Sequence, residues 1–167
     1  MINFNQSIYP KLDKSVKRII GIDPGVHTGF SVKNLETGTI ERVETMDILD
    51  AMDAVKTYLN TSEDIWLVFE DARLRTWFAE KGREALQGAG SIKRDCSIWE
   101  TFCKKYNVRY LAVKPTKGKT KYTSDFFNRL TGWKGRTSEH ARDAAMLVWG
   151  FNRNNLKLYF KIESVKI

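Results

Sequence analysis

Long uncharged apolar runs are absent from this chain of 167 residues. No run approaches the roughly 18 residues that a membrane helix needs, and the N-terminal segment lacks the apolar core of a signal peptide. Cysteine is also scarce, because the chain has only 2, which is too few for a zinc cage. Cys96 and Cys103 lie too far apart along one predicted helix face to bond each other. These absences predict a soluble cytoplasmic protein without membrane association, whose cysteines are core thiols.

Positive charge is present in excess, but one part of the chain supplies it. The net charge is +8, and residues 71–136 carry 16 Lys and Arg against 6 Asp and Glu, whereas residues 1–70 carry 7 against 11. Aromatic residues interleave with the basic ones in the central block: Trp77, Phe78, Trp99, Tyr106, Tyr110, Tyr122 and Trp133. This combination is typical of a nucleic-acid-binding protein. A basic face that only confers solubility is the alternative.

The length is that of one domain, because domains usually contain about 100–200 residues. Residues 1–16 have no sustained hydrophobic period and predict an extended N-terminal arm, so residues 17–151 would form the folded domain. Residues 152–167 alternate apolar and polar side chains, which predicts a C-terminal tail or edge strand.

Hydrophobic patterning within the domain predicts an α/β fold. The predicted strands are residues 17–23, 27–33, 39–46, 64–70 and 108–113. The first three follow one another directly and suggest an antiparallel meander. The last two each follow a predicted helix, so we expect them to run parallel to the first strand through crossover connections.

Two of the predicted core strands end on an acidic residue, Asp23 and Glu70. A buried unpaired carboxylate costs several kcal/mol, so an acid beside a core strand usually has a cation nearby. Because neighbouring parallel strands end at one sheet edge, we expect Asp23 and Glu70 to face each other. Without metal, repulsion among these two carboxylates and that of Asp143, described next, should raise at least one pKa. Asp23 could instead start the turn at Pro24 and Gly25, and Glu70 could simply reach water.

The last predicted helix supplies two further candidates. Thr137 or Ser138 would cap it, and His140 and Asp143, three residues apart, would project from one face of its first two turns. The helix is apolar on every side after Asp143, which indicates that it is buried. A lone His there is more often a hydrogen-bonded structural residue, but an Asp at the mouth of a buried helix is best explained by contact with the other two acids.

The longest predicted helix carries a stripe at spacings of three and four residues: Ala85, Ala89, Ile92, Cys96, Trp99, Cys103 and Tyr106. Packing on the chain's own sheet explains the stripe. Gly88-Ala89-Gly90 lies near the helix start, and a helical glycine costs about 1 kcal/mol relative to alanine. The glycines therefore suggest that a partner helix or DNA comes close, and a homodimer contact along this helix is the corresponding hypothesis.

Lysines gather in the segment after the fifth strand, where Lys114, Lys117, Lys119 and Lys121 fall around Gly118. Such a segment cannot be core. Beside a cluster of acids, ordered lysines would hold phosphates and offset charge in a transition state. A flexible solvated loop is the alternative.

Taken together, these motifs resemble the RuvC-type Holliday-junction resolvases of the RNase H-like superfamily. The resemblance covers residues 18–150 and rests on I-G-I-D-P-G at the end of the first strand, Glu70, the Gly-Ala-Gly helix, the lysine-bearing loop and H-x-x-D opening the last helix. It is similar to diverged versions found in phages, which would place the protein in the host cytoplasm. The resemblance implies an RNase H-like fold, with a five-stranded mixed sheet of three antiparallel and two parallel strands flanked by helices.

The resemblance also implies a homodimer that grips a four-way junction and hydrolyses DNA phosphodiester bonds with two Mg²⁺ ions per site, which Mn²⁺ could replace. The metal ligands would be Asp23, Glu70 and Asp143, with His140 in a fourth place that is an acid in many members. Lys119 or Lys121 would match the active-site lysine of the family. Trp77 or Phe78 would stand where the family uses an aromatic ring to wedge open the junction centre.

The residues expected to contact DNA are Arg73, Arg75, Trp77, Phe78, Lys81, Arg83, Lys93, Lys114, Lys117, Lys119 and Lys121. Another RNase H-like nuclease, acting on flaps, general branched DNA or RNA, is the nearest rival interpretation. A catalytically silent junction-binding protein is a second. The Asp-Pro-Gly turn also resembles the phosphate loop of actin-like ATPases, but those proteins duplicate the domain and need a longer chain.

Overall fold

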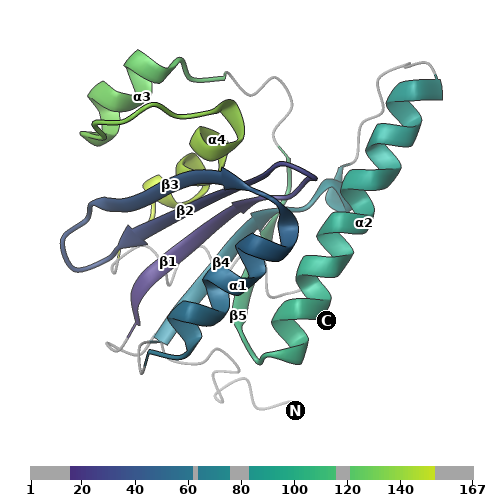
Figure 1. The fold of residues 1–167 in the computed structure, drawn as a ribbon, viewed down its shortest axis with the longest axis horizontal. Helices are drawn as coiled ribbons and strands as arrows, with labels where there is room; N and C mark the ends of the chain where they lie inside the picture. Colours follow the sequence, from purple (N-terminus) through teal and green to yellow (C-terminus); the bar gives the residue numbers. More distant parts are fainter. Residues whose placement is uncertain (1–15, 62–63, 76–82, 116–120, 153–167) are drawn as a thin grey trace, which may run out of the picture.

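A computed structural model describes residues 16–61, 64–75, 83–115 and 121–152 of the chain, without the side chains of residues 83–87. The core is one five-stranded sheet in the order β3-β2-β1-β4-β5 (Figure 1). Its strands are β1 (Val16–Asp23), β2 (Thr28–Asn34), β3 (Ile40–Met46), β4 (Asp64–Glu70) and β5 (Arg109–Val113). β2 runs antiparallel to both β1 and β3, whereas β4 runs parallel to both β1 and β5. This is the mixed sheet that the sequence predicts, with β1 starting one residue before the predicted domain boundary.

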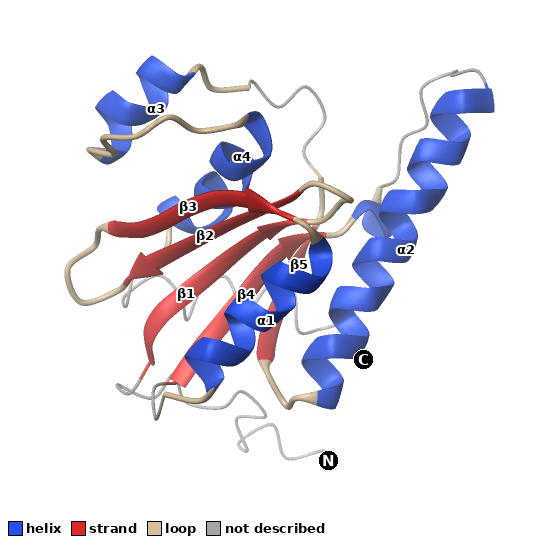
Figure 2. Cartoon of the chain, in the orientation of Figure 1, coloured by secondary structure: helices blue, strands red, loops and turns tan. Residues whose placement is uncertain are grey.

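Helices lie on both faces of this sheet, as the ribbon coloured by secondary structure shows (Figure 2). They are α1 (Ile48–Leu59), α2 (Arg83–Lys105), α3 (Ser124–Thr131) and α4 (Glu139–Trp149), with a short 3-10 helix, η1 (Ala72–Leu74), after β4. Of the two predicted caps of α4, Ser138 is the one in place, and Asp47 caps α1 in the same way: both side chains accept backbone N–H groups of the first turn. No helix in the described ranges is long and apolar enough to cross a membrane.

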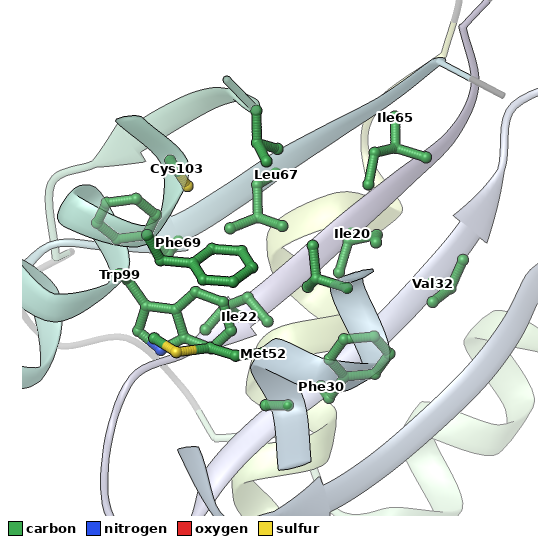
Figure 3. Packing of buried hydrophobic residues seen from close by; sticks show 14 of the residues in the cluster. Ile20, Ile22, Phe30, Val32, Met52, Ile65, Leu67, Phe69, Trp99 and Cys103 are labelled. Atoms are coloured by element: carbon green, nitrogen blue, oxygen red, sulfur yellow. The ribbon is translucent and has the colours of Figure 1, made fainter. Parts of the chain in front are cut away.

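The alternation of side chains along the strands divides the core into two layers. On one face, Ile20, Ile22 and Phe30 pack with residues of α1 and α2. Trp99 of α2 and Met52 of α1 belong to this cluster, which Figure 3 shows from close by. On the other face, the remaining strand residues pack against α4 and against the one fully buried residue of α3, Phe127. The centre of the sheet is therefore covered on both faces, which explains the continuous apolar runs in β1 and β4.

Among the described side chains of the α2 stripe, those in the middle are buried. Cys96, Trp99 and Cys103 are fully buried against the sheet, as predicted, whereas Ile92 and Tyr106 are exposed. Figure 1 shows that the N-terminal end of α2 projects past the strands, which explains the exposure of Ile92, whereas Tyr106 follows the C-terminal end of the helix. Gly88 lies near the start of α2, and no described atom outside the adjacent residues and the helix backbone comes within 4 Å of a Cβ placed there.

Candidate active site

The strand register places Asp23 and Glu70 together. The last printed pair of the parallel β1–β4 ladder is Ile22 with Phe69, so the next residues, Asp23 and Glu70, follow at the same edge. Because side chains alternate along a strand, both carboxylates project to the face that α4 covers. Asp23 is 21% exposed. The predicted juxtaposition of these two strand ends is confirmed.

Two glycines bring α4 directly onto the strands. A Cβ at Gly29 would lie 2.0 Å from the carbonyl oxygen of His140, and one at Gly21 would lie 2.1 Å from that of Ala144. Both distances are far shorter than any real contact, so a side chain at either position would displace the helix. Gly29 is also the antiparallel partner of Asp23. The glycines therefore set how closely the helix that carries His140 and Asp143 approaches Asp23.

Polar contacts fix both ends of α4. At its start, the hydroxyl of Ser138 accepts the N–H of Ala141 at 3.1 Å and shares a hydrogen bond with Thr45 of β3. At its end, the ammonium group of Lys33 donates to the carbonyl oxygens of Trp149 and, at 2.7 Å, Phe151. Lys33 is only 6% exposed, and this burial lowers its pKa. A buried lysine on these carbonyls is explained by the negative end of the helix dipole.

His140 contacts Asp23 directly. Its Nδ1 lies 2.9 Å from Oδ2 of Asp23, and its side chain is 51% exposed. Burial raises the pKa of Asp23, and the hydrogen bond from His140 opposes this shift. The negative charges of Asp143 and Glu70 raise the pKa further. The predicted rise of one carboxyl pKa is therefore present, although desolvation contributes more to it than repulsion does.

These electrostatic effects show that Asp143 and Glu70 both lie near Asp23, as the sequence predicts. Within the described residues, no three His, Cys, Asp or Glu side chains form a group that could hold a metal ion as they stand. The donor set nevertheless suits a hard divalent cation, because it offers three carboxylates and one imidazole. A bound cation would also relieve the repulsion that raises the Asp23 pKa. Asp23, Glu70, Asp143 and His140 are thus the residues that would hold it.

The described part of the lysine segment reaches the same end of α4. Lys121 forms an ion pair with Glu139, the residue before His140. Lys114, which follows β5, is exposed. Lys117 and Lys119 lie outside the described residues, so of the two candidate active-site lysines the structure describes Lys121.

In the loop after β4, Arg73, which the sequence predicts to contact DNA, instead pairs with acidic residues of the protein itself. The guanidinium of Arg73 donates to Asp71 through Nε and Nη2, and its Nη2 also lies 2.6 Å from Oε2 of Glu100 on α2. Asp71 is buried and directly follows Glu70. Arg73 therefore ties the end of β4 to α2 and is engaged within the protein, because the buried Asp71 needs its charge. Arg75 is exposed and Lys93 is half-buried, while Trp77, Phe78, Lys81 and the Arg83 side chain lie outside the described residues.

No protein-family model and no curated protein matches the chain. Among solved structures, it is similar to T. thermophilus RuvC in complex with Holliday junction substrate, with 15% identity and a TM-score of 0.51. The match covers 79% of this chain and 90% of that chain. The chain has the RNase H-like fold of RuvC. The comparison thus confirms the fold that the motifs at Asp23, Glu70 and His140 imply.

Sequence reasoning found the acids of this RuvC-like fold but missed what positions them. Gly21 and Gly29 lie on the face of β1 and β2 that α4 covers. The small residues Ala141 and Ala144 of α4 are buried against this face. Glycine in a core strand is a signal of close backbone approach. The role of Lys33, which is buried and donates to the carbonyl oxygens at the end of α4, was missed as well.

Proposed function

We propose that the protein is a metal-dependent endonuclease that resolves four-way DNA junctions. The observation that carries the proposal is the convergence of His140, Asp143 and Glu70 around Asp23 on a RuvC-like fold. The basic segment from residue 71 to residue 136 supports a polyanionic substrate. The RuvC structure to which the chain is similar is itself bound to a Holliday junction.

The chemistry requires an activated water and a stabilised leaving oxygen, and two bound Mg²⁺ ions supply both functions. In the protein, the carboxylates of Asp23, Glu70 and Asp143 hold the negative charge that binds such ions. His140 orients the Asp23 carboxylate through its hydrogen bond. Lys121, next to this cluster, provides positive charge for a phosphate group.

The test compares cleavage of a labelled four-way junction in Mg²⁺ and in EDTA. Asp23→Asn should bind the junction with unchanged affinity and lose cleavage by at least about 10³-fold, because it removes a ligand without removing bulk. Asp53→Asn is the matched control, since Asp53 is an exposed residue of α1 paired with Lys56, and it should cut normally. Flap, fork and RNA–DNA hybrid substrates in the same assay separate a junction resolvase from other RNase H-like nucleases. Cleavage by Asp23→Asn at the wild-type rate would refute the proposal.

The proposed nuclease is a homodimer that uses the projecting end of α2. No described atom outside the helix backbone lies within 4 Å of a Cβ at Gly88 or Gly90, and Ile92, one turn after Gly88, is 42% exposed. Two glycines and an exposed isoleucine on one helix suit a close contact with a second copy of the same helix.

A further inference from the structure

A stacked pair of aromatic rings, one half-buried and one exposed, lies in the chain between the lysine segment and α4. The rings of Tyr122 and Phe126 stack with their centroids 5.2 Å apart and an interplanar angle of 6°. Phe126 is nevertheless 43% exposed. We call these two residues the aromatic pair. A flat ring surface that is already stacked on one side and open to solvent can accept a further ring by stacking.

The aromatic pair is held rigidly against the helix of the candidate active site. Phe127, the next residue, is fully buried in the cluster that contains α4. Arg142 of α4 donates from Nε to the carbonyl oxygen of Tyr122 at 2.8 Å and from Nη1 to that of Thr137 at 2.6 Å. Arg142 therefore fastens both ends of the segment that carries α3. Arg142 directly precedes Asp143, so α4 both holds the segment of the aromatic pair and carries one of the candidate acids.

The surroundings of the aromatic pair are basic. Residues 121–136 contain four basic residues and one acidic residue, Asp125. Lys121 adjoins the pair in sequence and contacts Glu139 at the start of α4. A pre-organised aromatic surface within positive charge, next to candidate catalytic groups, is complementary to a nucleic-acid strand, since every base offers a stacking face and every phosphate a negative charge.

We propose that the Tyr122–Phe126 pair is a stacking platform for an unpaired base of the nucleic-acid substrate, on the α4 side of the active site. This inference rests on the proposed function and adds a substrate contact to it. The contact is independent of base identity, so it recognises an unstacked nucleotide as such and does not read sequence.

The test measures binding of the full-length protein to labelled single-stranded DNA and to a four-way junction, in EDTA so that nothing is cut. Phe126→Ala and Phe126→Leu should both bind about 5- to 160-fold more weakly, the fold-change that loss of one stacked base produces. Phe126→Trp should restore wild-type affinity because it keeps a flat ring. Leu130→Ala, one turn further along α3 with 40% exposure, is the matched apolar control and should bind within twofold of the wild type.

Phe126→Leu retains apolar bulk, so it keeps the test informative if the alanine variant fails to fold. Wild-type affinity in a folded Phe126→Leu protein would overturn the proposal. Equal losses in the Phe126 and Leu130 variants, accompanied by a lower mass in light scattering, would also overturn it and would identify a protein contact. The two proposals fail separately. A protein that binds through Phe126 but never cuts refutes the nuclease alone, whereas one that cuts while Phe126→Leu binds normally refutes only the stacking platform.

Discussion

Asp23 is the residue on which the candidate site converges, and its charge opposes folding when no cation is bound. Its raised pKa means that the folded protein binds a proton at this carboxyl more tightly than the unfolded chain does. The resulting stability is fully present below the unfolded value of 3.8 and is lost as the pH rises through the folded pKa. At neutral pH the ionised carboxylate is therefore a local cost to the fold.

Asp23→Asn should consequently raise the melting temperature of the protein in EDTA at pH 7 by a few degrees, since each kcal/mol shifts the melting temperature of a chain of this size by about 2–4 °C. Mg²⁺ at about 10 to 100 times its dissociation constant should stabilise the wild type by about 1.4–2.7 kcal/mol and should have little effect on the variant. Thermal melts followed by circular dichroism measure both shifts. An equal Mg²⁺ shift in the two proteins would remove Asp23 from the ligand set.

Glu100 shows the opposite electrostatic case. Hydrogen bonds from Lys104 and Arg73 lower its pKa to about 2. A depressed carboxyl pKa contributes stability above the ordinary value of 4.5, and this stability is lost as the pH falls toward about 2. The Arg73 network should therefore weaken in acid.

Urea unfolding of the wild type and of Glu100→Gln measures this contribution. The wild type should be more stable than the variant at pH 6, and the difference should shrink steadily between pH 4.5 and pH 2.5, because Glu100 becomes protonated there. A difference that stays constant over this range would show that the ionised form of Glu100 contributes nothing.

At the scale of elements, α4 is positioned by backbone contact. Gly29→Ala forces a Cβ against the His140 carbonyl, and overpacking of this kind costs up to about 3 kcal/mol. It should also shift His140 away from Asp23 and so reduce cleavage even in the fraction that stays folded. Differential scanning calorimetry and the junction assay measure the two effects.

Gly150→Ala is the control for this prediction. Gly150 ends the same helix with φ −72°, and no described atom lies within 4 Å of a Cβ at that position. The variant should be neutral or slightly stabilising, by about 0.4–1 kcal/mol, because alanine restricts the unfolded chain. If Gly29→Ala were as stable and as active as Gly150→Ala, the close contact of α4 with the strands would not determine the geometry of the site.

The elements themselves were predictable because their hydrophobic periods are clear. The five strands and their parallel or antiparallel sense follow from short apolar runs and from the helices between them. The close approach of α4 to the sheet was not predictable in the same way, since it depends on which strand face Gly21 and Gly29 occupy. That face is determined by the register of β1 against β2, a tertiary property that a local pattern does not contain.

At the scale of the whole molecule, the two faces of the sheet have different roles. Both faces carry a packed hydrophobic layer, but only the face covered by α4 also carries Asp23 and Glu70 at one end. The residue types alone predicted that the site lies at this end of the sheet, because an unpaired carboxylate at the end of a core strand costs free energy of folding. The internal use of Arg73 was not predictable from charge, since it depends on Asp71 being buried beside it.

The projecting end of α2 leads to a prediction about assembly. The wild type should have a mass in solution of about twice the 19.3 kDa of the chain. Ile92→Lys should reduce it to one chain, because a charge on that face opposes close helix contact. Leu130→Lys, a substitution of similar exposure on α3, is the control and should leave the mass unchanged. Light scattering after size-exclusion chromatography measures it, and a wild-type monomer would contradict the dimer.

The contact of α4 with Gly21 and Gly29 has a consequence for how this protein tolerates change. Two hydrogen atoms in place of side chains define the spacing of the site, so a deep mutational scan should show two almost invariant columns at positions that carry no chemistry. Exposed polar residues around the site can be substituted, but Gly21 and Gly29, where the strands contact α4, cannot. Related chains should therefore keep glycine at both positions even where their surface residues differ.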